Sequence, residues 1–117
     1  MQADSKRLSQ ATRALLQDPD NQLFLSAASS WEIAIKYALG KLPLPLPPVE
    51  YVLSRMETSG TTPLPVQHSH ALHVGSLPHH HADPFDRLLI AQAQLESLDL
   101  LTVDRQFEAY EVALLWA

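Results

Sequence analysis

The sequence predicts an α/β fold with a mainly parallel sheet and helices on both of its faces. Two short apolar runs, residues 22–27 and 98–103, have the length and composition of buried strands. Segments with helical spacing of their apolar residues lie between these runs and on either side of them. Strands separated by helices usually pair in parallel, because each connection crosses over the sheet.

The composition fits one globular domain over residues 1–117, with 46% hydrophobic and 18% charged residues. The absence of cysteine excludes disulfides, thiolate metal sites and a cysteine nucleophile. No leader-like segment and no apolar run of about 18 residues are seen, so we expect a cytoplasmic protein. A net charge of −5 argues against a broad basic surface for nucleic acid, although a nuclease whose acidic site is neutralised by metal remains compatible with it.

The first helix is predicted over residues 5–16, before a turn rich in aspartate. The strand over residues 22–27 is followed at once by a second helix over residues 29–39. We expect Ser29 or Ser30 to cap this helix and a glycine to end it.

Glu32 lies on the second helix, at the edge of its apolar arc. Two structural interpretations compete for it: a capping box with Ser29, or an ion pair with Lys36 one turn later. Each is worth only a few tenths to about 1 kcal/mol, so neither requires glutamate in particular.

Alternating leucine and proline over residues 42–48 predict an extended connector, with a polyproline ligand for a partner as the alternative. A short helix is expected over residues 49–57 and an edge strand, limited by its prolines, over residues 61–66. Residues 68–75 predict another short helix.

Asp83 and Pro84 mark the start of the central helix, since aspartate is a good N-cap and proline at the first helical position loses no hydrogen bond. Asp86 then falls in the first turn and points toward the apolar side, whereas Arg87 points to the opposite side. Either Asp86 completes a capping pair at the positive end of the helix dipole, or it faces a cleft and binds a cation.

Acidic residues from three separate segments fall near predicted strand ends. Glu32 follows the first strand, Asp86 opens the helix that leads into the strand at residues 98–103, and Asp104 directly follows that strand. A helical turn over residues 105–110 and a last strand over residues 112–116 complete the chain. Function gathers at the carboxyl ends of parallel strands, and clustered carboxylates favour Mg²⁺ or Mn²⁺. Such a site suits phosphodiester hydrolysis.

All six histidines lie between residues 68 and 81. A zinc site is one interpretation, but no cysteine supports it, and surface histidines with a helix-entry loop explain the run better. Arg87 and Arg105 each follow a candidate site acid. We interpret both as solvated surface arginines, with contact to RNA phosphate as the alternative.

Three blocks follow one another along the chain: SAASSWEIAIK at residues 26–36, LPHHHADPFDRLLIAQA at residues 77–93, and LTVDRQF at residues 101–107. In this order they resemble the PIN-domain family, specifically the VapC-type toxins of toxin–antitoxin systems. The resemblance implies a PIN-like three-layer α/β/α fold and an endoribonuclease that depends on Mg²⁺ or Mn²⁺. It also implies an RNA substrate, a cognate antitoxin protein as inhibitor, and a homodimer.

By position in these blocks, the residues that match the family's metal-site acids are Glu32, Asp86 and Asp104. Asp83 matches a family position too, but its N-cap geometry makes a structural role at least as good an explanation. His81 also matches the family motif, at the rim of the expected acidic cleft.

One departure from the family pattern concerns the N-terminal strand, which carries an Asp-Thr-His motif and supplies the central strand and the first site acid. The sequence given starts at the loop that would follow this strand, and Asp4 does not match the missing acid. We therefore expect weak or absent nuclease activity, in a fragment, a misassigned start or a shortened form. The alternative function is a catalytically inactive PIN-like module that binds an antitoxin or self-associates, which unpaired strand edges would favour.

Overall fold

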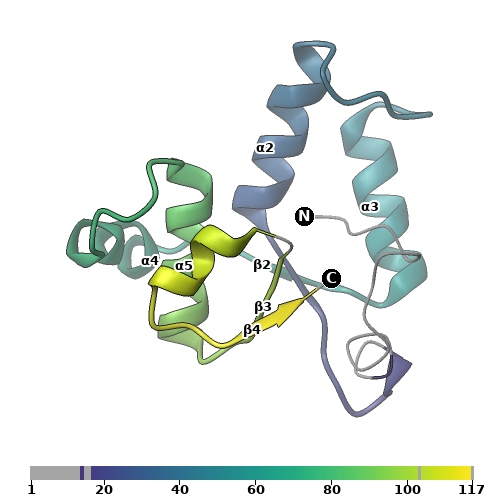
Figure 1. The fold of residues 1–117 in the computed structure, drawn as a ribbon. Coiled ribbons are helices and arrows are strands. Elements are labelled where there is room, and N and C mark those ends of the chain that lie inside the picture. Colours follow the sequence, from purple (N-terminus) through teal and green to yellow (C-terminus); the bar gives the residue numbers. More distant parts are fainter. Residues whose placement is uncertain (1–13, 15–16, 103, 117) are drawn as a thin grey trace. The chain divides into compact units, whose positions relative to one another are not determined.

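The computed structural model describes residue 14, residues 17–102 and residues 104–116. The chain divides into two compact units (Figure 1). One unit is Gln22–Pro65, and the other runs from Val66 onward and includes the residues up to Asn21. All but one residue of the helix predicted over residues 5–16 lies outside the described residues.

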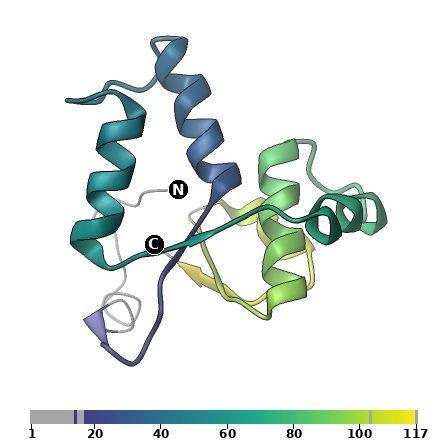
Figure 2. The ribbon, with the colours of Figure 1, turned by 180° about the vertical axis from the view of Figure 1, so that it is seen from behind.

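The unit Gln22–Pro65 contains one pair of parallel strands and two helices. Phe24 of the first strand lies opposite Thr62 of the second. The two helices lie beside each other in both ribbon views (Figures 1 and 2). In chain order the elements are β1 (Phe24–Ser26), α2 (Ala27–Ala38), α3 (Pro48–Ser59) and β2 (Thr62–Leu64).

Helix α2 begins earlier than predicted. Ser26, the last residue of β1, is its N-cap, and the Ser26 hydroxyl accepts a hydrogen bond of 3.0 Å from the backbone N–H of Ala28. The predicted caps Ser29 and Ser30 are therefore wrong, and so is the capping box of Ser29 with Glu32. The reason is that the chain turns from strand to helix without a loop, so the serine at the strand end is the one placed to cap.

The other predicted elements of this unit are confirmed. The helix expected over residues 49–57 is α3, and the proline-limited strand expected over residues 61–66 is β2. Helix α3 ends at Gly60, whose φ of 68° lies in the left-handed region that glycine adopts without strain. The leucine–proline connector before α3 is neither helix nor strand.

In the unit from Val66 onward, the long helix α5 packs against a second pair of parallel strands and a short helix. Leu100 lies opposite Leu114 in this pair. The elements are α4 (His68–His73), η2 (Val74–Ser76), α5 (Pro84–Glu96), β3 (Leu100–Thr102), η3 (Arg105–Ala109) and β4 (Leu114–Trp116).

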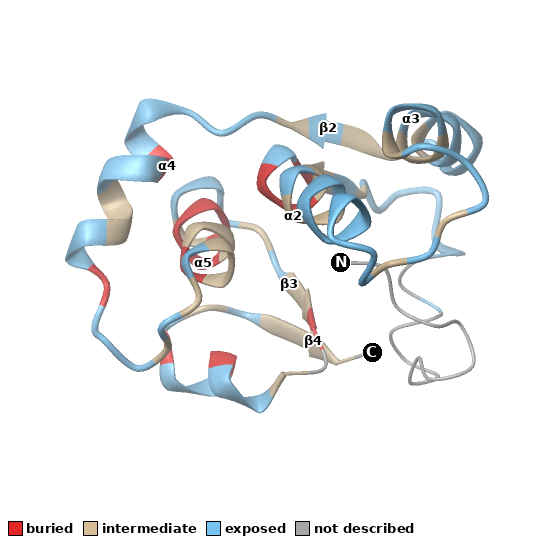
Figure 3. Cartoon of the chain, turned by 90° about the horizontal axis from the view of Figure 1, so that it is seen from above, coloured by how far each residue is buried: buried red, intermediate tan, exposed pale blue. Residues whose placement is uncertain are grey.

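The apolar core of this unit is centred on α5, as the burial colours show (Figure 3). Ile90 and Ala91 of α5 are completely buried, and Phe107 and Tyr110 close the core from the segment between β3 and β4. Since η3 carries Phe107, the connection from β3 to β4 is fixed by the core and not only by strand pairing. Asp104, at the start of that connection, is held in place as a result.

These observations confirm the α/β class and the parallel pairing of the strands. Within the part of the chain that the structure describes, no helix is both long and apolar enough to cross a bilayer.

Candidate metal centre

Asp83 sets the geometry of the site by starting α5. Its carboxylate accepts hydrogen bonds from the backbone N–H groups of Phe85, at 2.8 Å, and Asp86, at 3.2 Å. With Pro84 as the first helical residue, the predicted N-cap is confirmed. The carboxylate of Asp83 is thus used by the helix end, whereas the carboxylate of Asp86, one turn further, contacts the loop before α5.

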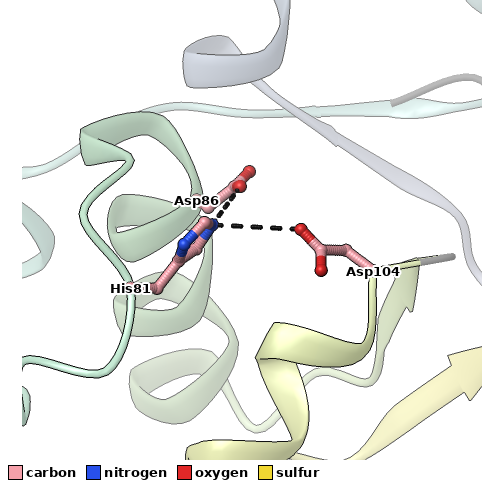
Figure 4. A group of neighbouring side chains, drawn as sticks. All are labelled: His81, Asp86 and Asp104. Carbon is pink, nitrogen blue, oxygen red and sulfur yellow. Dashed lines mark hydrogen bonds and ion pairs between the residues drawn. The ribbon is translucent and has the colours of Figure 1, made fainter.

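Asp86 meets His81, which lies on the loop before α5. The His81 Nε2 atom is 2.7 Å from Asp86 Oδ2, and the two side chains are 11% and 22% exposed (Figure 4). A pair this short and this sheltered is stronger than an ion pair on an open surface, because little water screens it.

Asp104 approaches the same pair from the end of β3. Its Oδ1 atom accepts a hydrogen bond of 2.9 Å from the backbone N–H of Gln106 and caps η3. Its Oδ2 atom lies 4.0 Å from His81 Nε2 (Figure 4). One oxygen of Asp104 therefore builds the turn, while the other faces the cluster.

His81, Asp86 and Asp104 form a group that fits a divalent cation. Each offers one ligand atom, and the three ligand atoms lie within 4.8 Å of one another. Ligands about 2.1 Å from a metal are themselves separated by about 3 Å when adjacent and about 4.2 Å when opposite. The group is therefore close to a coordinating arrangement, with two carboxylate oxygens and one imidazole nitrogen as donors.

The acidic surroundings raise the pKa of His81 above its ordinary value. The main cause is the hydrogen bond to Asp86, while the charges of Asp86, Asp104 and Asp83 add to it and burial opposes it. The imidazolium form is favoured because its positive charge lies among three carboxylates. When it is protonated, His81 offsets part of the negative charge of these carboxylates.

This pKa shift predicts a pH-dependent contribution of His81 to folding in metal-free buffer. Since the folded-state pKa exceeds the unfolded value of about 6.5, the contribution is fully present below that value and is lost as pH rises through the folded pKa. We expect the free energy of unfolding of the wild type, minus that of His81→Asn, to fall as pH rises above about 6.5. Urea unfolding of both proteins at several pH values, in buffer with excess chelator, measures this difference in the free energy of unfolding. A difference that does not change with pH would contradict the prediction.

Arg87 differs from its predicted role. It is 7% exposed, and its guanidinium donates hydrogen bonds inside the protein, so the interpretations as a solvated arginine and as a phosphate contact are both wrong. The acceptors are the carbonyl oxygens of Val74, Leu77, Pro78 and His81 and the hydroxyl of Tyr110, at 2.9–3.4 Å.

Tyr110 holds the same loop from the other side. Its hydroxyl accepts hydrogen bonds from the backbone N–H groups of His80, at 3.2 Å, and His81, at 2.9 Å. Sequence reasoning missed this pair, although one signal was available. Arg87 precedes Ile90 and Ala91 by three and four residues, so the three residues share a helix face, and the latter two are completely buried.

Glu32 lies on α2, in the unit Gln22–Pro65. Its Oε2 atom is 3.3 Å from Lys36 Nζ, which confirms the predicted ion pair, and its side chain is 25% exposed. An i,i+4 pair of this kind stabilises a helix by about 0.3–0.5 kcal/mol, too little to explain the residue by itself. A role of Glu32 in metal binding stays a prediction.

The remaining candidates divide between surface and interior. Arg105 is exposed, pairs with Glu108 at 2.7 Å and lies over the ring of Trp116, as expected of a surface arginine. His70, in contrast, is 1% exposed, so the interpretation of the histidines as surface residues is wrong there. Its Nδ1 atom accepts a hydrogen bond from the backbone N–H of Gln67, which makes it part of the start of α4.

Comparison with known proteins supports the resemblance seen in the sequence. The profile of the PIN domain family matches residues 2–113. A stretch of 62 residues is 58% identical to "Ribonuclease VapC16" of Mycobacterium tuberculosis (strain ATCC 25618 / H37Rv). That stretch covers 53% of this chain and 44% of the relative, less than half of the relative's length. No solved structure matches the chain significantly.

Proposed function

This chain belongs to the PIN-domain family, and we propose that it acts as a metal-dependent ribonuclease, the toxin of a toxin–antitoxin system. The observation that carries the proposal is the meeting of Asp86 and Asp104 at His81, beside the carboxyl end of β3. The name of the relative, a VapC ribonuclease, supports RNA as the substrate.

We propose Glu32, Asp86 and Asp104 as the acidic metal-site residues, with Mg²⁺ or Mn²⁺ as the cation. For Asp86 and Asp104 the geometry fits, since one oxygen of each faces the same imidazole. Glu32 is included because it occupies the matching position of the SAASSWEIAIK block. When bound, the cation supplies charge neutralisation at the phosphoryl oxygens and activation of water for hydrolysis of the phosphodiester.

The protein residues hold and orient these parts. Asp83 fixes the direction of the first turn of α5, and therefore of the Asp86 carboxylate. Gln106 holds one oxygen of Asp104 through its backbone N–H, which leaves the other oxygen directed at the site. Arg105, exposed next to Asp104, can reach a phosphate of the RNA backbone if it leaves Glu108.

The partners proposed with this function are a cognate antitoxin protein and a second copy of the chain. Exposed large apolar side chains on helices α2 and α3 support binding of protein partners. Trp31 and Leu53 are 61% exposed, and Val49 is 72% exposed. The same observation favours the alternative function, a docking module without catalysis. Metal binding and RNA cleavage separate the two.

RNA cleavage with and without divalent cation tests the proposal directly. We expect weak cleavage of a single-stranded RNA in Mn²⁺ or Mg²⁺ and none in excess chelator. The docking module would be favoured if the chain leaves the RNA intact and binds neither cation with a dissociation constant below about 1 mM.

Replacing Glu32 with glutamine tests its place in the site. We expect Mn²⁺ affinity to fall about tenfold, which equals about 1.4 kcal/mol, because one anionic ligand is lost. Lys36→Met is the matched control, since it removes the same ion pair but keeps the carboxylate. Calorimetry with Mn²⁺ measures both variants, and equal affinities in Glu32→Gln and the wild type would remove Glu32 from the site.

A further inference from the structure

We propose that the imidazole of His81 is itself a metal ligand and makes the site select Mn²⁺ and Co²⁺ over Mg²⁺. The inference rests on the proposed metal site at Asp86 and Asp104 and extends it, because carboxylates alone would leave Mg²⁺ a good occupant.

The position of the imidazole supports this role. His81 Nε2 is 2.7 Å from Asp86 Oδ2 and 4.0 Å from Asp104 Oδ2, so it lies between the two acids (Figure 4). A cation that both carboxylates bind must therefore either bond to this nitrogen or displace the ring. Bonding to Nε2 requires this nitrogen to release its proton to solvent, and a metal bond then replaces the hydrogen bond to Asp86, whereas displacement of the ring breaks that hydrogen bond with nothing in its place.

The loop that carries His81 is anchored on both sides, which makes displacement costly. The backbone N–H of His81 donates to the Tyr110 hydroxyl at 2.9 Å, and its carbonyl oxygen accepts from Arg87 at 3.4 Å. The ring also packs edge-on against Phe107, with centroids 6.1 Å apart. A ligand that is already held near its bound position loses little conformational entropy when the metal arrives.

The chemistry of the donor set then decides which cation binds. Mg²⁺ requires oxygen ligands in near-ideal octahedral geometry, whereas imidazole nitrogen is a good ligand for first-row transition metals. For a site with one nitrogen and two carboxylates, affinity rises from Mn²⁺ to Co²⁺. The selectivity against Mg²⁺ should therefore depend on His81.

Calorimetric titrations of Mg²⁺, Mn²⁺ and Co²⁺ into the wild type and His81→Asn test the selectivity. We expect the substitution to weaken Co²⁺ binding at least tenfold and Mg²⁺ binding less than about twofold. His79→Asn is the matched control, because this histidine is exposed on the same loop and is outside the group of three ligands. It should leave all affinities unchanged.

Pulsed electron paramagnetic resonance of the Mn²⁺-loaded protein gives an independent readout. We expect hyperfine coupling to an imidazole ¹⁴N in the wild type and in His79→Asn, and its loss in His81→Asn. Absence of this coupling in the wild type would overturn the inference even if His81→Asn did not fold. Thermal unfolding of each variant shows whether it is folded.

The outcomes distinguish this inference from the function on which it rests. Suppose that the wild type binds metal and that Asp86→Asn abolishes this binding. If His81→Asn then keeps the wild-type affinities for the three cations and the nitrogen coupling, only the ligand role of His81 is refuted. If the wild type binds none of the three cations, the metal site itself is refuted.

Discussion

Replacing Asp86 with asparagine is expected to lower metal-dependent RNA cleavage by roughly 100-fold, which corresponds to about 2.7 kcal/mol of transition-state stabilisation. The carboxylate is the acid closest to His81, and it is 22% exposed, so its charge acts in a partly dehydrated environment. Asparagine keeps the volume and one acceptor oxygen but removes the negative charge that holds a cation. Cleavage rates measure the loss of activity, and calorimetric titration with Mn²⁺ measures the loss of cation affinity.

The control for this prediction is Asp99→Asn, which removes the same charge from an exposed position just before β3. It should change cleavage less than about twofold, because an exposed charge at the other end of β3 from Asp104 is screened by salt. Cleavage retained at the wild-type rate in Asp86→Asn would remove this residue from catalysis.

The convergence of Asp86 and Asp104 could be predicted from the sequence because it depends on local rules. An Asp-Pro pair fixes where α5 begins, and a short apolar run fixes where β3 ends. These two positions are then brought together by the packing of α5 on the strand. Nothing in this reasoning requires knowledge of distant side chains.

The buried position of Arg87 was not predicted in the same way. The helical spacing was interpreted as turning Arg87 away from the apolar side, whereas Arg87 lies on the helix face of Ile90 and Ala91 and is buried with them. Its burial depends on acceptors in the loop before α5 and on Tyr110, which is 23 residues away in sequence. The shared helix face indicates that Arg87 is buried, but no local pattern predicts which acceptors it meets there.

The cap of α2 shows a different limit. Both Ser26 and Ser29 are good N-cap residues, and the sequence places each near the end of a predicted strand. The choice between them depends on where β1 ends, and that is set by its pairing with β2 nearly forty residues later. The ion pair of Glu32 with Lys36 was predictable because both residues lie on one helix.

Replacing Arg87 with methionine should destabilise the protein by about 3 kcal/mol. The substitution keeps an unbranched side chain of similar reach, so it tests the hydrogen bonds more than the packing. Hydrogen bonds from a charged donor contribute about 1.5–3 kcal/mol each in mutational series, and the freed carbonyl oxygens of the loop can recover part of this by contacting water. Because a small domain is stable by only about 5–15 kcal/mol, the loss should be plain in urea unfolding.

Arg87→Lys and Tyr110→Phe separate charge from geometry in this cluster. Lysine keeps the positive charge, but its single ammonium group cannot reach all the acceptors that the planar guanidinium contacts. We therefore expect Arg87→Lys to recover less than half of the stability that Arg87→Met loses. Tyr110→Phe removes the hydroxyl between Arg87 and His81 and should cost about 1–2 kcal/mol. In a double-mutant cycle the two substitutions should be non-additive, because they share the hydrogen bond from Arg87 to Tyr110. Strict additivity would mean that the loop before α5 is held by its own backbone rather than by the arginine and the tyrosine.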